Sequence, residues 1–229
     1  MIVGEEVVQR LSKIPVETFH VHEDVLGGSS IFLQDALKGR LGSPSPVQIT
    51  LPTIYPFVFQ VYVNWLYKDH LYIADTSTNL SSFFWKQCYE LADLLQDCTF
   101  KDALIGTLIE NIIANDAQPW GPTLPKIVYS STTRESPHRK LLVDLAVHTW
   151  HSRILGFMFA YGRSEHLPQE FHLDVMAALV ADCRSRAART EQVSPREFLK
   201  DIDTCMYHEH TVIKVPYSIT PCYKTRHET

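Results

Sequence analysis

The residues best suited to chemistry lie near the carboxyl terminus. They are Cys205, His208, His210 and Cys222. Thiolate sulfur and imidazole nitrogen bind zinc tetrahedrally, and Cys-x2-His is an acceptable half-site. A zinc module usually presents two closely spaced ligand pairs, whereas Cys222 stands alone well beyond His210. The spacing therefore favours a packed or mobile tail without metal. A zinc-binding tail, or a small hydrolytic enzyme that uses it, is the alternative of another class.

Two further histidines, His20 and His22, alternate along an extended run and would share one face of a strand. A metal site there would need further ligands of suitable softness nearby. We expect no metal at this pair. Phe19 and Val21, which alternate with the histidines, should fill the core.

Nothing in the sequence arranges a nucleophile for catalysis. Because the chain has 11 histidines, a serine or cysteine nucleophile can always be paired with a histidine base, so such a pairing is not evidence of catalysis. The chain contains no GxSxG elbow, no HExxH, no glycine-rich phosphate loop and no paired CxxC. We therefore expect a protein that is not an enzyme and that uses no cofactor.

Three consecutive aromatic residues, Phe83, Phe84 and Trp85, open a predicted helix. Adjacent helical side chains spread over about 200° in total, so at least one of the three should point to solvent. Aromatic residues are enriched where interfaces concentrate their binding energy. Phe83 and Trp85 are the candidates for contact with a protein partner.

The composition is that of an ordinary globular protein, with 45% hydrophobic and 21% charged residues in 229. A net charge of -5 argues against nucleic acid, which is bound through lysine and arginine. No segment approaches the roughly 20 apolar residues of a membrane helix, and the amino terminus lacks a signal-peptide pattern. The five scattered cysteines do not form a disulfide framework. We expect an intracellular protein of cytoplasm or nucleus, with no membrane or nucleic-acid partner.

Periodicity predicts alternating strands and helices in the first half of the chain. The expected elements are strands at 18–22, 47–51 and 71–73 and helices at 24–38, 56–67, 81–95 and 104–113. Asp24 is the predicted cap of the first helix. Together these elements predict the α+β class for residues 1–115.

Prolines and a glycine at 116–125 predict a hinge. Beyond it, helical spacing predicts a helical extension at 126–190, with helices at 137–150, 154–161 and 168–186. Residues 191–229 carry weaker patterns and should form a loosely structured tail.

The run FHVHEDVLGGSSIF resembles the start of the BTB/POZ family, in its fungal-type form. The resemblance continues in order through the next strand, a proline-to-tyrosine helix and YELADLL. The residues at the family's spacing are Phe19, His22, Val25, Leu26, Ser30, Ile49, Leu51, Pro56, Phe59, Trp65, Leu66 and Tyr67.

This resemblance covers roughly residues 1–115. It implies a small antiparallel sheet flanked by helical hairpins, with His22 hydrogen-bonded locally beneath the first helix. It also implies a non-enzymatic protein-interaction module, either an adaptor or a self-associating scaffold. Some members of the family recruit a cullin scaffold of ubiquitin ligases, so a substrate adaptor of that kind is the alternative.

Two departures from the family affect the expected partners. Glu23 stands where the family has lysine or arginine, which argues against its charge-paired dimer. No acidic residue occurs between Pro56 and Tyr67, where cullin-binding members carry a hydrophobic-x-acidic pattern. Self-association and cullin binding therefore remain open at this point.

Overall fold

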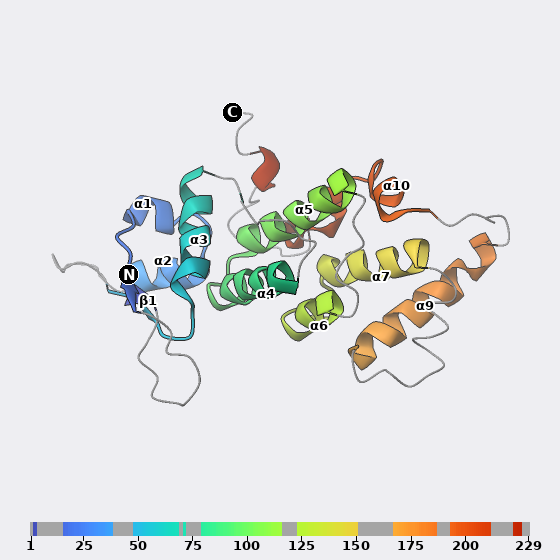
Figure 1. Ribbon diagram of the computed structural model, residues 1–229, viewed down its shortest axis with the longest axis horizontal. Coiled ribbons are helices and arrows are strands. Elements are labelled where there is room, and N and C mark those ends of the chain that lie inside the picture. The colour runs from blue at the N-terminus through green and yellow to red at the C-terminus, as the bar shows by residue number, and fades with distance from the viewer. Residues whose placement is uncertain are drawn as a thin grey trace. The chain divides into compact units, whose positions relative to one another are not determined.

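The computed structural model describes residues 2–3, 16–38, 48–68, 71, 79–115, 123–150, 167–186, 193–211 and 222–225. Figure 1 labels the helices and strands of the chain, which divides into two compact units. Unit 1 contains residues 1–74, 83–104 and 223–229, and unit 2 contains residues 75–82 and 105–222. Each unit is described by itself below.

Unit 1 is built from helices joined by short turns. It comprises α1 (Glu23–Leu26), α2 (Ile31–Lys38), α3 (Pro56–Lys68), α4 (Asn79–Leu94) from Phe83 onward, the start of α5 (Cys98–Asn115), and the 3₁₀ turn η4 (Tyr223–Thr225). The helix expected at 56–67 matches α3. The helix expected at 24–38 is instead divided between α1 and α2, because Gly27 and Gly28 form a turn. Glu23 rather than Asp24 begins α1.

Two buried polar residues fix where these helices begin and end. Ser30 Oγ accepts from Leu33 N, at the start of α2, and donates to the carbonyl of Leu95, just past α4. Asp97 directly precedes α5, and its carboxylate accepts from Phe100 N at 2.9 Å and from the Tyr62 hydroxyl at 2.8 Å. This aspartate explains why α5 starts before the expected residue 104.

Strand structure is confined to three two-residue segments among the described residues. β1 (Ile2–Val3) pairs antiparallel with β2 (Glu17–Thr18) and parallel with β3 (Thr50–Leu51), in the order β2-β1-β3. These short pairings do not form a sheet layer. The predicted α+β class is therefore wrong, and the described structure is all-α.

The local sequence explains why the expected strands are so short. The run at 18–22 leaves strand geometry after Thr18, because the carbonyl of His22 already accepts from Val25 N at 3.1 Å in the first turn of α1. Of the run at 47–51, residues 48–51 are described, and among these only Thr50–Leu51 pair; Pro52 follows without a backbone donor. Of the strand expected at 71–73, only Leu71 is described, and it is not in a strand.

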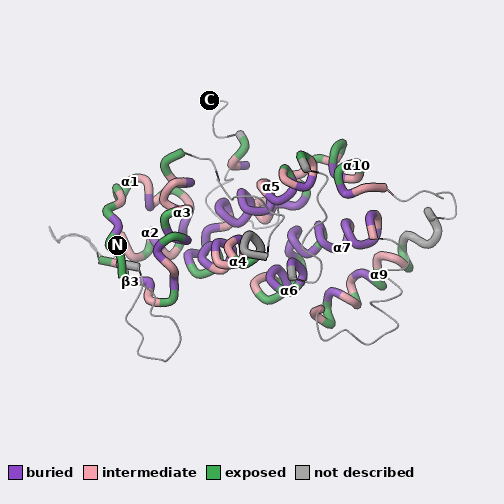
Figure 2. The backbone as a smooth tube through the Cα atoms, viewed as in Figure 1, coloured by how far each residue is buried: buried purple, intermediate pink, exposed green. Residues whose placement is uncertain are grey.

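Unit 2 is organised around one helix that is buried on nearly all sides. Its elements are the rest of α5, α6 (Thr123–Ser130), α7 (Pro137–Thr149), α9 (Gln169–Arg186), α10 (Pro195–Leu199) and the 3₁₀ turns η2 (Thr204–Tyr207) and η3 (Glu209–Thr211). Helix α7 contacts α6, α9, α10 and η2, and Figure 2 colours it mostly as buried. Ser136 caps α7 by accepting from His138 N, with Pro137 at the first helical position.

The helices expected at 137–150 and 168–186 correspond to α7 and α9. The helix expected at 154–161 and most of the hinge at 116–125 lie outside the described residues. Residues 193–211, expected to be loosely structured, instead form α10, η2 and η3. No helix among the described residues combines the length and apolar character needed to cross a membrane.

Candidate metal centre

Two short turns hold three of the four metal-binding candidates. Asp203 caps η2 by accepting from Cys205 N at 2.9 Å, and His208 N donates to the carbonyl of Cys205 at 3.0 Å. In a 3₁₀ turn, residues i and i+3 lie on the same side. Cys205 and His208 therefore face the same space, and η3 adds His210 immediately afterwards.

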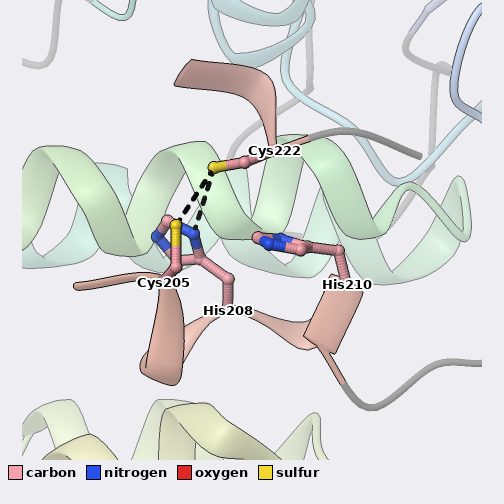
Figure 3. Close-up of side chains that lie close together, drawn as sticks. All are labelled: Cys205, His208, His210 and Cys222. Carbon is pink, nitrogen blue, oxygen red and sulfur yellow. Dashed lines mark hydrogen bonds between the residues drawn. The ribbon is translucent and has the colours of Figure 1, made fainter. Parts of the chain in front are cut away.

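Cys222, which lies far from the other three residues along the sequence, completes the group. Its Sγ lies 3.6 Å from Cys205 Sγ and 3.6 Å from His208 Nδ1. One ligand atom from each of the four residues lies within 4.8 Å of all the others. Figure 3 shows the four side chains converging from η2, η3 and the segment that precedes η4.

These separations match the edges of a tetrahedral zinc site. With Zn–S of about 2.3 Å and Zn–N of about 2.05 Å, a regular tetrahedron has S···S and S···N edges of about 3.8 and 3.6 Å. The Cys205 Sγ–Cys222 Sγ and Cys222 Sγ–His208 Nδ1 separations, both 3.6 Å, lie close to these values. The His210 ring has its centroid 5.2 Å from that of His208, and its ligand atom lies within 4.8 Å of those of the other three residues.

Burial separates this group from a chance surface cluster. His208 is fully buried and Cys222 is 8% exposed, while Cys205 and His210 are half-buried. Two thiols and two imidazoles are suited to zinc, since soft thiolate ligands disfavour magnesium and calcium.

Helix α7 holds the ligand-bearing turns in place. Glu209, which lies between the two histidine ligands, accepts from Ser136 Oγ at 3.2 Å and lies 3.9 Å from His138 Nδ1. Tyr207 is buried, and its hydroxyl donates to Asp144 at 3.0 Å. Burial raises the pKa of the Tyr207 hydroxyl, and the Asp144 carboxylate raises it further, so this hydroxyl stays protonated and keeps donating. The turns are thus fixed on both sides of His208.

The interface candidates have different surroundings. Phe83 is 48% exposed, as an interface residue requires. Trp85 is 1% exposed, its indole Nε1 donates to the carbonyl of Leu104 at 3.2 Å, and its ring stacks on Tyr89. The prediction for Trp85 is wrong, because α4 turns this side chain into the core of unit 1.

Neither His20 nor His22 belongs to a metal-ligating group among the described residues. Both are exposed, and His22 N donates to the Tyr67 hydroxyl at 3.2 Å. Phe19 is buried as expected, whereas Val21 is only half-buried.

The remaining residues of the BTB/POZ resemblance divide by burial. Buried members are Leu26, Ser30, Leu51, Pro56, Phe59 and Trp65. Val25, Ile49 and Leu66 are half-buried, and Tyr67 is 47% exposed.

Sequence reasoning missed the buried cation of unit 2. Arg139 is 7% exposed on its side chain, and its guanidinium donates to the carbonyls of Tyr129 and Thr132, to the Thr132 hydroxyl and to Glu170. It also lies over the Tyr129 ring. The sequence shows only that Arg139 lies in the first turn of α7, three residues after its cap Ser136, and this position does not indicate that the side chain is buried.

Comparison with known proteins found no matching family model, no matching curated protein and no matching solved structure.

Proposed function

We propose that the protein is a non-enzymatic protein-interaction module whose unit 2 is held together by a structural zinc ion. One observation carries the proposal: four thiol and imidazole ligands converge within 4.8 Å at a largely buried position. The ion would connect Cys222 to the turns that carry Cys205, His208 and His210. Metal binding at such a site contributes directly to folding.

The ligand number favours a structural role over the hydrolytic alternative. A catalytic zinc site has three protein ligands and keeps its fourth position for water or substrate. Four protein ligands would fill a tetrahedral coordination shell, which would leave no position for a bound water. The same residues that first suggested a zinc-dependent enzyme therefore support a closed site.

Exposed aromatic side chains in unit 1 support the proposed role in protein interaction. Phe57 is 48% exposed, and its ring stacks on Tyr55 at 5.4 Å and on Phe84 at 5.5 Å between centroids. The neighbouring Phe83 is also 48% exposed. Aromatic residues are enriched at protein interfaces. The BTB/POZ resemblance over residues 1–115 points to the same kind of function.

Cobalt substitution tests whether the site is closed. Co²⁺ bound by two thiolates and two imidazoles should give the visible absorption of a tetrahedral centre, and added azide or cyanide should leave that spectrum unchanged. A spectrum that shifts with the added anion would show an open position. That result would overturn the structural role and favour the hydrolytic alternative.

Recruitment of a cullin stays a prediction. Light scattering of the purified protein with an equimolar cullin amino-terminal domain tests it directly. A heteromeric peak would support a ubiquitin-ligase adaptor. Separate peaks for the two proteins would exclude the adaptor and leave a scaffold with other partners.

A further inference from the structure

The two thiols of the candidate metal centre lie in contact with each other. Cys205 Sγ and Cys222 Sγ are 3.6 Å apart, although the two residues are 17 positions apart in the chain. Figure 3 shows the two sulfur atoms pointing toward each other beside the His208 ring. A disulfide requires the sulfur atoms to approach to about 2.05 Å. The fold has thus already brought together a pair of thiols that oxidation can join.

The two thiols differ in their access to solvent. Cys205 is half-buried, whereas Cys222 is buried. A dissolved oxidant therefore reaches Cys205 first. Redox-sensing pairs typically combine one accessible thiolate with a second thiol that resolves its oxidised form. Cys205 has the exposure that the first role requires, and Cys222 has the position that the second role requires.

The proposed zinc ion also favours oxidation of this pair. Only deprotonated sulfur binds the metal, and the thiolate is also the form that attacks an oxidant. Cys88 is in the opposite situation, because burial raises the pKa of its thiol to about 12 and keeps it protonated at neutral pH. An oxidant should therefore modify Cys205 in preference to Cys88.

We propose that Cys205 and Cys222 form a redox-active pair, which hydrogen peroxide joins in a disulfide with release of the zinc ion. The release rests on the structural zinc site proposed above. The Cys205 thiolate attacks one peroxide oxygen, the O–O bond breaks, and the departing hydroxide takes up a proton to form water. The Cys222 thiolate then attacks the sulfur of the resulting sulfenic acid, and a second hydroxide leaves as water. The two sulfur atoms lose two electrons in total, and the peroxide gains them.

The disulfide removes two of the four metal ligands. Its sulfur atoms carry no charge, so only the imidazoles of His208 and His210 remain, and the ion leaves. Cys222 stays joined to η2 through the new bond, whereas His210 loses the ion that connects it to the other ligands. Reduction of the disulfide by a thiol restores both thiolates and allows zinc to bind again. The oxidant thus exchanges a metal cross-link for a covalent one.

Titration of the zinc-loaded full chain with hydrogen peroxide tests the proposal. A chromogenic zinc indicator follows the released metal, and mass spectrometry of the denatured, unreduced chain follows the thiols. The wild type should release about one zinc ion per disulfide formed, and each chain should lose two hydrogen atoms. Peptide mapping should place the disulfide between Cys205 and Cys222. Dithiothreitol followed by zinc should restore the starting mass and metal content.

Two variants separate the redox pair from the metal. Cys222→Ser removes the resolving thiol, so Cys205 should proceed to sulfinic acid and gain two oxygen atoms. His210→Ala keeps both thiols and removes one zinc ligand, so its disulfide should form at the same or a lower peroxide concentration. Cys98→Ser is the control, because Cys98 lies outside the metal-ligating group and its loss should leave the wild-type response unchanged.

The outcomes distinguish this proposal from the structural site itself. A wild-type chain that binds zinc but forms no disulfide between Cys205 and Cys222 would overturn the redox pair and leave the structural site standing. Sulfinic acid on Cys205 of the wild type, or a disulfide to another cysteine, would also overturn the pair. A chain that binds no zinc would overturn the structural site together with zinc release, and the mass of the treated chain would still decide whether the two thiols join.

Discussion

Cys222→Ser should release the metal and destabilise unit 2. In the native protein Cys222 Sγ lies 3.6 Å from both Cys205 Sγ and His208 Nδ1. Cys205 and Cys222 are 17 residues apart in the chain, so an ion that joins them closes a loop. An ion that binds only the folded chain stabilises it by about 3 kcal/mol once free metal exceeds its Kd by about 150-fold. The variant should lose at least this much free energy of unfolding.

Thermal unfolding followed by circular dichroism measures the effect. For a chain of this length each kcal/mol shifts Tm by about 2 to 4 °C, so the expected loss is about 6 to 12 °C. A strong chelator should lower the wild-type Tm by a similar amount, and added zinc should restore it. The same chelator should leave Cys222→Ser unchanged.

Cys98→Ser is the matched control, because Cys98 is a half-buried cysteine of unit 1 outside the metal-ligating group. Its Tm should fall on chelation by as much as that of the wild type. A wild-type Tm that does not respond to the chelator would refute the structural role of the four ligands.

Three further predictions concern the core. Arg139→Met should lower the free energy of unfolding by about 3 kcal/mol in urea denaturation, since it removes the buried donor of two backbone carbonyls and of the half-buried Thr132 hydroxyl. Exposed Arg134→Met should change the free energy of unfolding by less than about 0.5 kcal/mol. Ser30→Ala should cost about 1 to 3 kcal/mol in the same assay, because both backbone partners of its hydroxyl lose their bond, and an unchanged midpoint would contradict this account. Burial raises the pKa of the Cys88 thiol from 9.0 to about 12, so the unfolded chain releases this proton first and stability should fall as pH rises from 9 to 12. Cys88→Ala should show a shallower loss between about pH 9 and pH 12, and equal slopes would exclude the thiol as a cause.

Helical periodicity predicted most of the helices because their apolar stripes reflect real burial. Phe59 and Tyr62 of α3 are fully buried at the spacing that predicted them. The strand predictions were wrong because two-residue alternation is a weak signal. At 18–22, the His22 carbonyl also accepts a helical hydrogen bond from Val25 N, which competes with strand pairing. A short alternating run cannot show whether a neighbouring strand exists to pair with it.

The metal ligands illustrate a different limit. Cys205 and His208 are three residues apart, so their proximity follows from local turn geometry. Cys222 reaches them through the fold of the intervening chain, which spacing alone does not reveal. The sequence therefore identified all four residues as candidates. It argued against a metal site because Cys222 is far from His210 along the chain, but the fold brings the two residues close together.

Native mass spectrometry tests the central claim most directly. Protein purified without chelators should carry one zinc per chain, with two thiol protons displaced by the metal. Cys222→Ser should carry less than the wild type, while Cys98→Ser should keep one zinc. A wild-type chain that stays metal-free after incubation with zinc would contradict the account.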